Sequence, residues 1–89
     1  MEPDEREYAR WVGAHVTRLR KQLGLTQAEL ATKVGLEEAS SLQRIEHGRR
    51  PPSFKRLVAL ARELKVPASV LLTPTVPNPP QSGRPRGRS

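Results

Sequence analysis

The chain has 89 residues, enough for one small domain that buries about 60% of its unfolded surface. It contains no cysteine, which excludes disulfides and thiolate metal sites, and its 2 histidines are too few for a metal centre without carboxylate help. With 16 Lys and Arg against 9 Asp and Glu, the net charge of +7 favours a polyanionic partner, either nucleic acid or an acidic membrane surface.

A helical pattern begins after Pro3 and continues to the first glycine stop. Apolar residues recur within it at spacings of three and four, which is the pattern of one buried helical stripe. These residues are Tyr8, Val12, Val16, Leu19 and Leu23. Gly24 is predicted to end this helix, because glycine readily adopts the left-handed conformation that closes many helices.

The second helix is predicted over residues 27–34. Thr26 is its expected N-cap, and Glu29 completes a capping box, in which the side chain of each residue bonds the backbone N–H of the other. Gly35 ends the helix. A third helix is predicted over residues 38–47, with Leu42 and Ile45 facing inward, and it ends before the next glycine.

Two more helices complete the predicted fold. Ser53 caps the fourth, and the fifth starts at Pro67 and ends near Leu72. The inward residues of the fourth helix are Leu57, Leu60, Ala61 and Leu64. Because no segment alternates like a strand, we predict an all-α fold over residues 1–72, a compact bundle of about five short helices containing a helix-turn-helix.

The second and third helices, joined by a glycine turn, have the arrangement that sets a helix into the DNA major groove. LGLTQAELATKVG, RIEHGRRPPS and LVALARELKV, at residues 23–35, 44–53 and 57–66, resemble the phage repressor and Cro-like helix-turn-helix family. The resemblance covers about residues 12–72 and implies a sequence-specific transcription factor. The chain carries one residue more than the family pattern, which we place in the turn at residues 36–38.

The third helix is predicted to read bases with the face turned away from the core. Gln43 and Arg44 are the best readers, since glutamine bonds adenine at N6 and N7 and arginine bonds guanine at O6 and N7. Ser40 suits a base edge or a phosphate, and Ala39 suits a thymine methyl group. His47 suits a phosphate or the last carbonyls of its own helix. The alternative is that these are ordinary solvated residues.

Phosphate contacts are expected at two places. Thr26 and Gln27 begin the second helix, whose N–H groups suit a phosphate, and the resemblance implies that Gln27 helps to place that helix on the DNA backbone. Basic residues follow the third helix closely: Arg49, Arg50, Lys55 and Arg56. Their phosphate contacts would set affinity and salt dependence rather than sequence preference. The alternative is a solvated basic loop.

Four further charged residues have other expected roles. The resemblance implies that Arg20 and Glu46 form a pair fixing the third helix against the first, although desolvation offsets the Coulomb attraction. Glu37 and Glu38 weaken the interpretation as a DNA-binding helix, because acids at its leading end repel phosphate. We interpret them as first-turn residues suited to the helix dipole, with cytosine N4 as the alternative partner.

The last 17 residues, 73–89, hold five prolines, two glycines and three arginines. One aliphatic residue cannot offset the entropy of ordering, so we expect a disordered C-terminal tail. Residues 83–89 partly resemble an AT-hook, whose arginines enter the narrow minor groove of A·T-rich DNA. The alternative is a basic tail that adds unspecific attraction.

The leading hypothesis is a cytoplasmic DNA-binding regulator, a repressor, whose partner is double-stranded DNA. A homodimer is expected, because one helical face cannot hide Val70, Leu71 and Leu72 together. The alternative is a protein-binding module, an antitoxin or adaptor, that uses the acidic start of the chain. We expect no enzyme, cofactor, metal or membrane span, since the sequence has neither a nucleophile–base pair nor an apolar run of roughly 18 residues.

Overall fold

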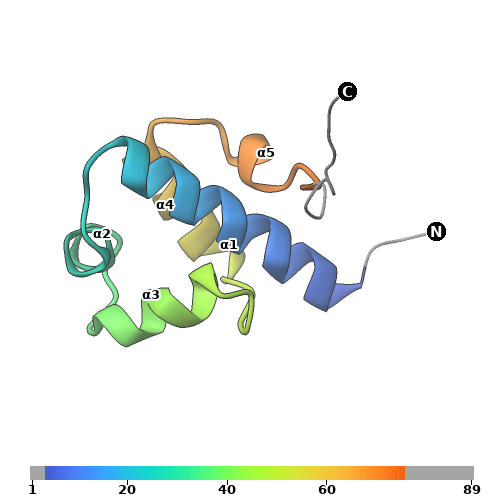
Figure 1. Ribbon diagram of the computed structural model, residues 1–89, viewed down its shortest axis with the longest axis horizontal. Coiled ribbons are helices and arrows are strands. Elements are labelled where there is room, and N and C mark those ends of the chain that lie inside the picture. Colours follow the sequence, from blue (N-terminus) through green and yellow to red (C-terminus); the bar gives the residue numbers. More distant parts are fainter. Residues whose placement is uncertain (1–3, 76–89) are drawn as a thin grey trace, which may run out of the picture.

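The computed structural model describes residues 4–75, and this part of the chain folds into five helices without a strand. They are α1 (Glu5–Gln22), α2 (Gln27–Lys33), α3 (Ala39–Glu46), α4 (Phe54–Leu64) and α5 (Ala68–Leu71). Figure 1 shows α1 running along the length of the molecule, and it contacts α3, α4 and α5. The predicted all-α class is therefore confirmed. The AT-hook-like run and the rest of the chain after Thr75 lie outside the described residues.

Three of the helices begin at a side-chain cap. The Asp4 carboxylate accepts the Glu7 N–H at 2.9 Å at the start of α1, and Thr26 and Ser53 cap α2 and α4 in the same way. The last two caps agree with the sequence prediction. Glu38 is instead the N-cap of α3, so the expectation that the neighbouring acids lie inside the first helical turn is wrong. Short polar residues in extended conformation thus fix where α2 and α4 start.

The core lies between α1 and the other four helices and is almost entirely aliphatic. Its largest fully buried side chains are Leu30, Leu42, Leu57, Leu60, Leu71, Val12 and Val16. Leu23 departs from the prediction, because it is the C-cap of α1 and 42% exposed rather than part of the buried stripe. Two charged residues are buried among the apolar ones: Arg20, which belongs to α1, and Glu46, which is the last residue of α3.

Two glycines let α1, α2 and α3 meet at short range. Gly35 has a φ of +80° and turns the chain from α2 toward α3, a conformation that side chains with a Cβ disfavour. Gly13 lies within α1, directly against the last turn of α3, and a Cβ there would lie only 2.4 Å from the Ile45 carbonyl oxygen. The orientation of α3 is therefore set by backbone contact with α1 as well as by side chains.

Candidate functional site

The outer face of α3 presents the side chains that the sequence singled out. Ser40, Gln43, Arg44 and His47 are exposed, and Ala39 is half-buried. The opposite face carries the core residues of the helix, which are buried. The helical phase assigned from the sequence therefore matches the structure, and the predicted base-reading residues share one accessible surface.

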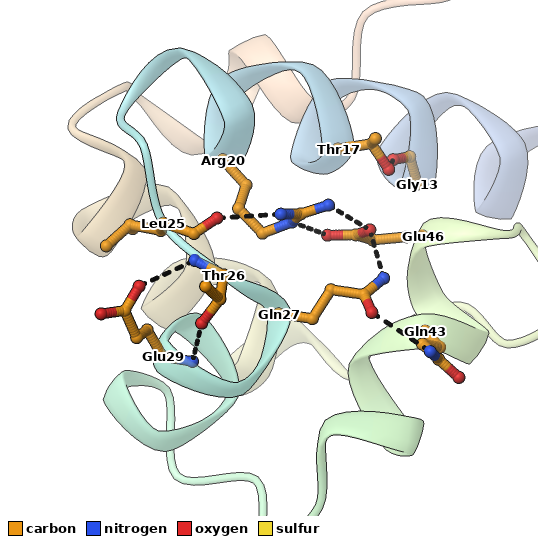
Figure 2. A network of polar contacts seen from close by, with 9 residues as sticks. All are labelled: Gly13, Thr17, Arg20, Leu25, Thr26, Gln27, Glu29, Gln43 and Glu46. Carbon is orange, nitrogen blue, oxygen red and sulfur yellow. Dashed lines mark hydrogen bonds and ion pairs between the residues drawn. The ribbon is translucent and has the colours of Figure 1, made fainter.

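Gln27 connects this outer face to the interior, as Figure 2 shows. Its Nε2 donates to Glu46 Oε1 at 2.9 Å, while its Oε1 accepts from Gln43 Nε2 at 3.2 Å. Gln27 is the first residue of α2, so the carboxamide of Gln43 is held at the junction of the two helices. One weak signal of this bridge is present in the sequence: Gln27 stands at the start of the helix but has no part in the capping box.

The charged pair suggested by the family resemblance is present. Arg20 Nε donates to Glu46 Oε2 at 2.6 Å and Nη2 donates to Glu46 Oε1 at 3.2 Å, a two-pronged contact. Arg20 Nη1 also donates to the Leu25 carbonyl at 2.8 Å. The side chains of Arg20 and Glu46 are 11% and 3% exposed. One guanidinium therefore joins α1, the turn before α2, and the end of α3 (Figure 2).

The basic segment after α3 divides into two kinds of residue. Arg49, Arg50 and Lys55 are exposed. Arg56 is half-buried, and its Nη1 donates to the carbonyl of Val34, the residue that ends α2. The expectation that all four basic residues face phosphates is therefore revised, because the guanidinium of Arg56 is used to close α2.

The leading end of α3 is acidic and exposed. Glu38 Oε1 accepts the Ser40 hydroxyl at 3.1 Å, so this carboxylate bonds a neighbouring side chain within the same turn. Glu37 is exposed beside it in the connection between α2 and α3. Both acids therefore border the surface that carries Gln43 and Arg44, as the sequence indicated.

The predicted capping box at the start of α2 is confirmed and perturbs one carboxyl group. Thr26 Oγ1 accepts the Glu29 N–H at 3.0 Å, and Glu29 Oε1 accepts the Thr26 N–H at 2.8 Å. The bond from the Thr26 backbone, followed by that from its side chain, lowers the pKa of Glu29. A lowered pKa in the folded state means that the ionised carboxylate stabilises the fold.

We expect Glu29→Gln to destabilise the domain at about pH 7 and to have a smaller effect at about pH 3, because the contribution of a carboxylate with a lowered pKa declines below the pKa of the unfolded state and is lost as the pH falls through that of the folded state. Urea denaturation of both proteins at the two pH values measures the difference. Glu37→Gln, an exposed change outside the capping box, is the control. An equal effect of Glu29→Gln at both pH values would contradict the role assigned to the charge.

Residues 4–75 offer little support for other kinds of site. Within that range, no three His, Asp or Glu side chains gather as metal ligands would. None of the described helices combines the length and the apolar character that crossing a membrane requires.

Comparison with known proteins identifies relatives of this arrangement. A family model described as helix-turn-helix matches residues 16–71, more than half of the chain. The chain is 40% identical over 68 residues to an uncharacterized HTH-type transcriptional regulator, y4dJ of Sinorhizobium fredii, covering 76% of this chain and 87% of that protein.

Two solved structures have the same architecture. The restriction-modification controller protein C.AhdI from Aeromonas hydrophila is 30% identical, with a TM-score of 0.66 over 71% of this chain and 94% of that one. The biofilm master regulator SinR, solved in complex with DNA, is 32% identical, with a TM-score of 0.64 over 70% of this chain and 98% of that one. The likeness therefore extends over nearly the whole of each of these two chains.

Proposed function

This chain belongs to the helix-turn-helix family of DNA-binding transcriptional regulators, and we propose that it is a repressor that reads its operator in the major groove with α3. The observation that carries the proposal is the outer face of α3. Gln43 and Arg44 stand exposed there, on a helix whose other face is buried. Glutamine and arginine are the residue types whose side chains can form two hydrogen bonds at once with a base edge in the major groove.

Hydrogen bonds from α1 and α2 hold α3 in place, and this favours specific contacts with bases over unspecific binding to DNA. Glu46 fixes the end of the helix through Arg20, and Gln27 joins that pair to Gln43. A side chain already held by such bonds loses less conformational freedom on binding than a free one. We infer that Gln43 meets DNA in a restricted orientation, whereas exposed Arg44 adapts to the base edge.

We propose that the affinity for DNA comes mainly from the basic residues beside this face of α3. Arg49, Arg50 and Lys55 are exposed after α3, and we propose that they contact the phosphates beside the groove, together with His47. We assign Thr26 a phosphate contact too, because its hydroxyl accepts the capping bond and keeps its own hydrogen to donate.

The remaining residues of the face have smaller proposed roles. Ala39 is the first residue of α3, and we propose that it contacts a thymine methyl group. Gln27 is the first residue of α2, and we propose that it contacts the DNA backbone. Ser40 donates to Glu38 in the free protein, so a bond from Ser40 to DNA requires its hydroxyl to turn away. We expect Glu38 and Glu37 to lower affinity for phosphate and to favour sites that offer cytosine N4.

A dimer is proposed because a single module contacts few base pairs and related domains commonly bind two half-sites. Leu72, just after α5, is 40% exposed, while Leu71 is fully buried and Val70 packs partly against the core. We place the second copy at this end of the molecule. Selection of bound sequences from random duplex DNA tests both parts, since a dimer enriches palindromes and a monomer enriches a single half-site.

Arg44→Ala should relax sequence preference at one base pair of the selected operator and cost about 1–3 kcal/mol of binding free energy there. Arg49→Ala is the matched change, because it removes an exposed arginine that we assign to phosphate. It should weaken binding to the operator and to its single-base variants alike, and reduce the slope of log K against log salt by about 1.

Both variants are measured on the same panel of operator variants at one fixed salt concentration. Uniform loss in both would show that α3 does not read bases through Arg44. Binding that hardly changes with salt would favour the alternative, a protein-binding module, because phosphate contacts release counterions whereas apolar protein interfaces do not.

A further inference from the structure

A cleft of about 540 Å³ lies between the first half of α1 and the end of α3. Trp11 and Ala14 line it on the α1 side, His47 lines it on the α3 side, and Glu7 lies at its end toward the helix start. Trp11 is the single tryptophan of the chain, and it is half-buried here rather than packed in the aliphatic core. Gln43 and Arg44 do not line this cleft, and His47 is the residue that the cleft shares with the proposed DNA-binding surface.

The chain after α5 enters this cleft and is anchored there. His15 Nε2 lies 2.9 Å from the Thr73 carbonyl oxygen, and His15 Nδ1 lies 2.9 Å from Arg18 Nη2. Because arginine can only donate, Nδ1 is the acceptor, and Nε2 carries the hydrogen that Thr73 receives. Pro74 and Thr75, the last residues that the structure describes, then form part of the cleft wall.

We propose that this cleft is the docking site of the chain's own proline-rich segment, residues 76–80. Pro74 already lines the cleft, as Trp11 does. Pro77 and Pro80 follow it at intervals of three residues, which is one turn of a polyproline II helix, so all three share one edge. Aromatic-lined grooves are the surfaces that receive proline-rich segments in this conformation.

The dimensions of the cleft fit this occupant. Along α1, Glu7 and Ala14 lie seven positions apart, which corresponds to about 10 Å at 1.5 Å per residue. In polyproline II geometry Pro77 lies about 9 Å beyond Pro74, at 3.1 Å per residue. A segment that leaves Pro74 beside Ala14 and follows α1 toward its start therefore places Pro77 close to Glu7.

Charge favours the same direction. The start of α1 carries three acids, Asp4, Glu5 and Glu7, with Arg6 among them and Arg10 one turn further along, where it lines the cleft. The chain beyond the prolines carries Arg84, Arg86 and Arg88 without an acid. A segment seated on Trp11 and directed toward the start of α1 brings its arginines toward these carboxylates.

The single tryptophan provides the test, because docking covers one face of its indole ring. We expect the acrylamide quenching constant of Trp11 to rise about twofold in a chain ending at Thr75 and in full-length Pro77→Ser/Pro80→Ser, with emission shifted to longer wavelength. Pro79→Ser is the matched control, because Pro79 lies off the shared edge and should leave quenching unchanged. Far-UV circular dichroism establishes that each variant keeps its helices.

Two results would overturn the proposal. One is equal quenching in the full chain and in the chain ending at Thr75, which would leave the cleft without this occupant. The other is protection of Trp11 that grows with protein concentration, which would assign the cleft to the tail of a second copy. Protection that is constant across a wide concentration range, lost in Pro77→Ser/Pro80→Ser and kept in Pro79→Ser supports docking within one chain.

Discussion

Replacing either Arg20 or Glu46 by alanine should lower the free energy of unfolding by about 3–5 kcal/mol, since each change leaves the other charge buried without its main partner. Total stabilities of roughly 5–15 kcal/mol are usual, so this is a large share for a small domain. Glu46 is the more enclosed side chain, at 3% exposure against 11% for Arg20. Without Arg20 its carboxylate keeps the bond from Gln27 Nε2.

A double variant separates two contributions to the free energy of unfolding: the penalty for leaving one charge buried without its partner, and the net contribution of the intact pair. Arg20→Met/Glu46→Leu replaces both charges by apolar side chains of similar size, and it should unfold at higher urea than either alanine variant. Lys21→Ala, an exposed change beside Arg20, should stay within about 0.5 kcal/mol of the native protein. Near-neutral alanine variants would contradict a buried pair.

The starts and ends of the helices could be predicted from the sequence because they depend on neighbouring residues. The Thr26 capping box is complete within four positions of the chain, and Gly35 ends α2 with a positive φ. The inward and outward faces of α3 also followed from helical spacing, which placed Leu42 and Ile45 in the core. The Arg20–Glu46 contact was expected from the family resemblance alone.

The details that spacing could not predict all depend on how the helices approach one another. Arg56 looked like another phosphate contact, but in the fold its guanidinium meets the carbonyl of Val34. The bridge from Gln27 to Gln43 joins residues 16 positions apart. Trp11 lines a cleft that α1, the end of α3 and the chain after α5 form together, and helical spacing within α1 does not reveal this cleft. The spacing of apolar residues indicates which face of a helix is buried, but it does not indicate which residues of other helices that face contacts.

Gly13 is a residue for which sequence and structure lead to opposite expectations. Glycine within a helix costs about 1 kcal/mol relative to alanine, so helix propensity alone predicts that Gly13→Ala stabilises α1. In the fold, a Cβ at this position would lie 2.4 Å from the Ile45 carbonyl oxygen and 2.6 Å from that of Glu46. Both contacts are with backbone, so rotating a side chain cannot relieve them.

We therefore expect Gly13→Ala to lower the free energy of unfolding by about 1–3 kcal/mol despite its better helix propensity, because α1 must move away from α3. That movement also separates Arg20 from Glu46, which lie across the same contact (Figure 2). Urea denaturation measures the change. Ala14→Gly, at the exposed neighbouring position, isolates the propensity effect and should cost about 0.5–1 kcal/mol. A Gly13→Ala protein as stable as the native one would show that α1 and α3 can separate without loss, so that close backbone contact does not hold α3 in place.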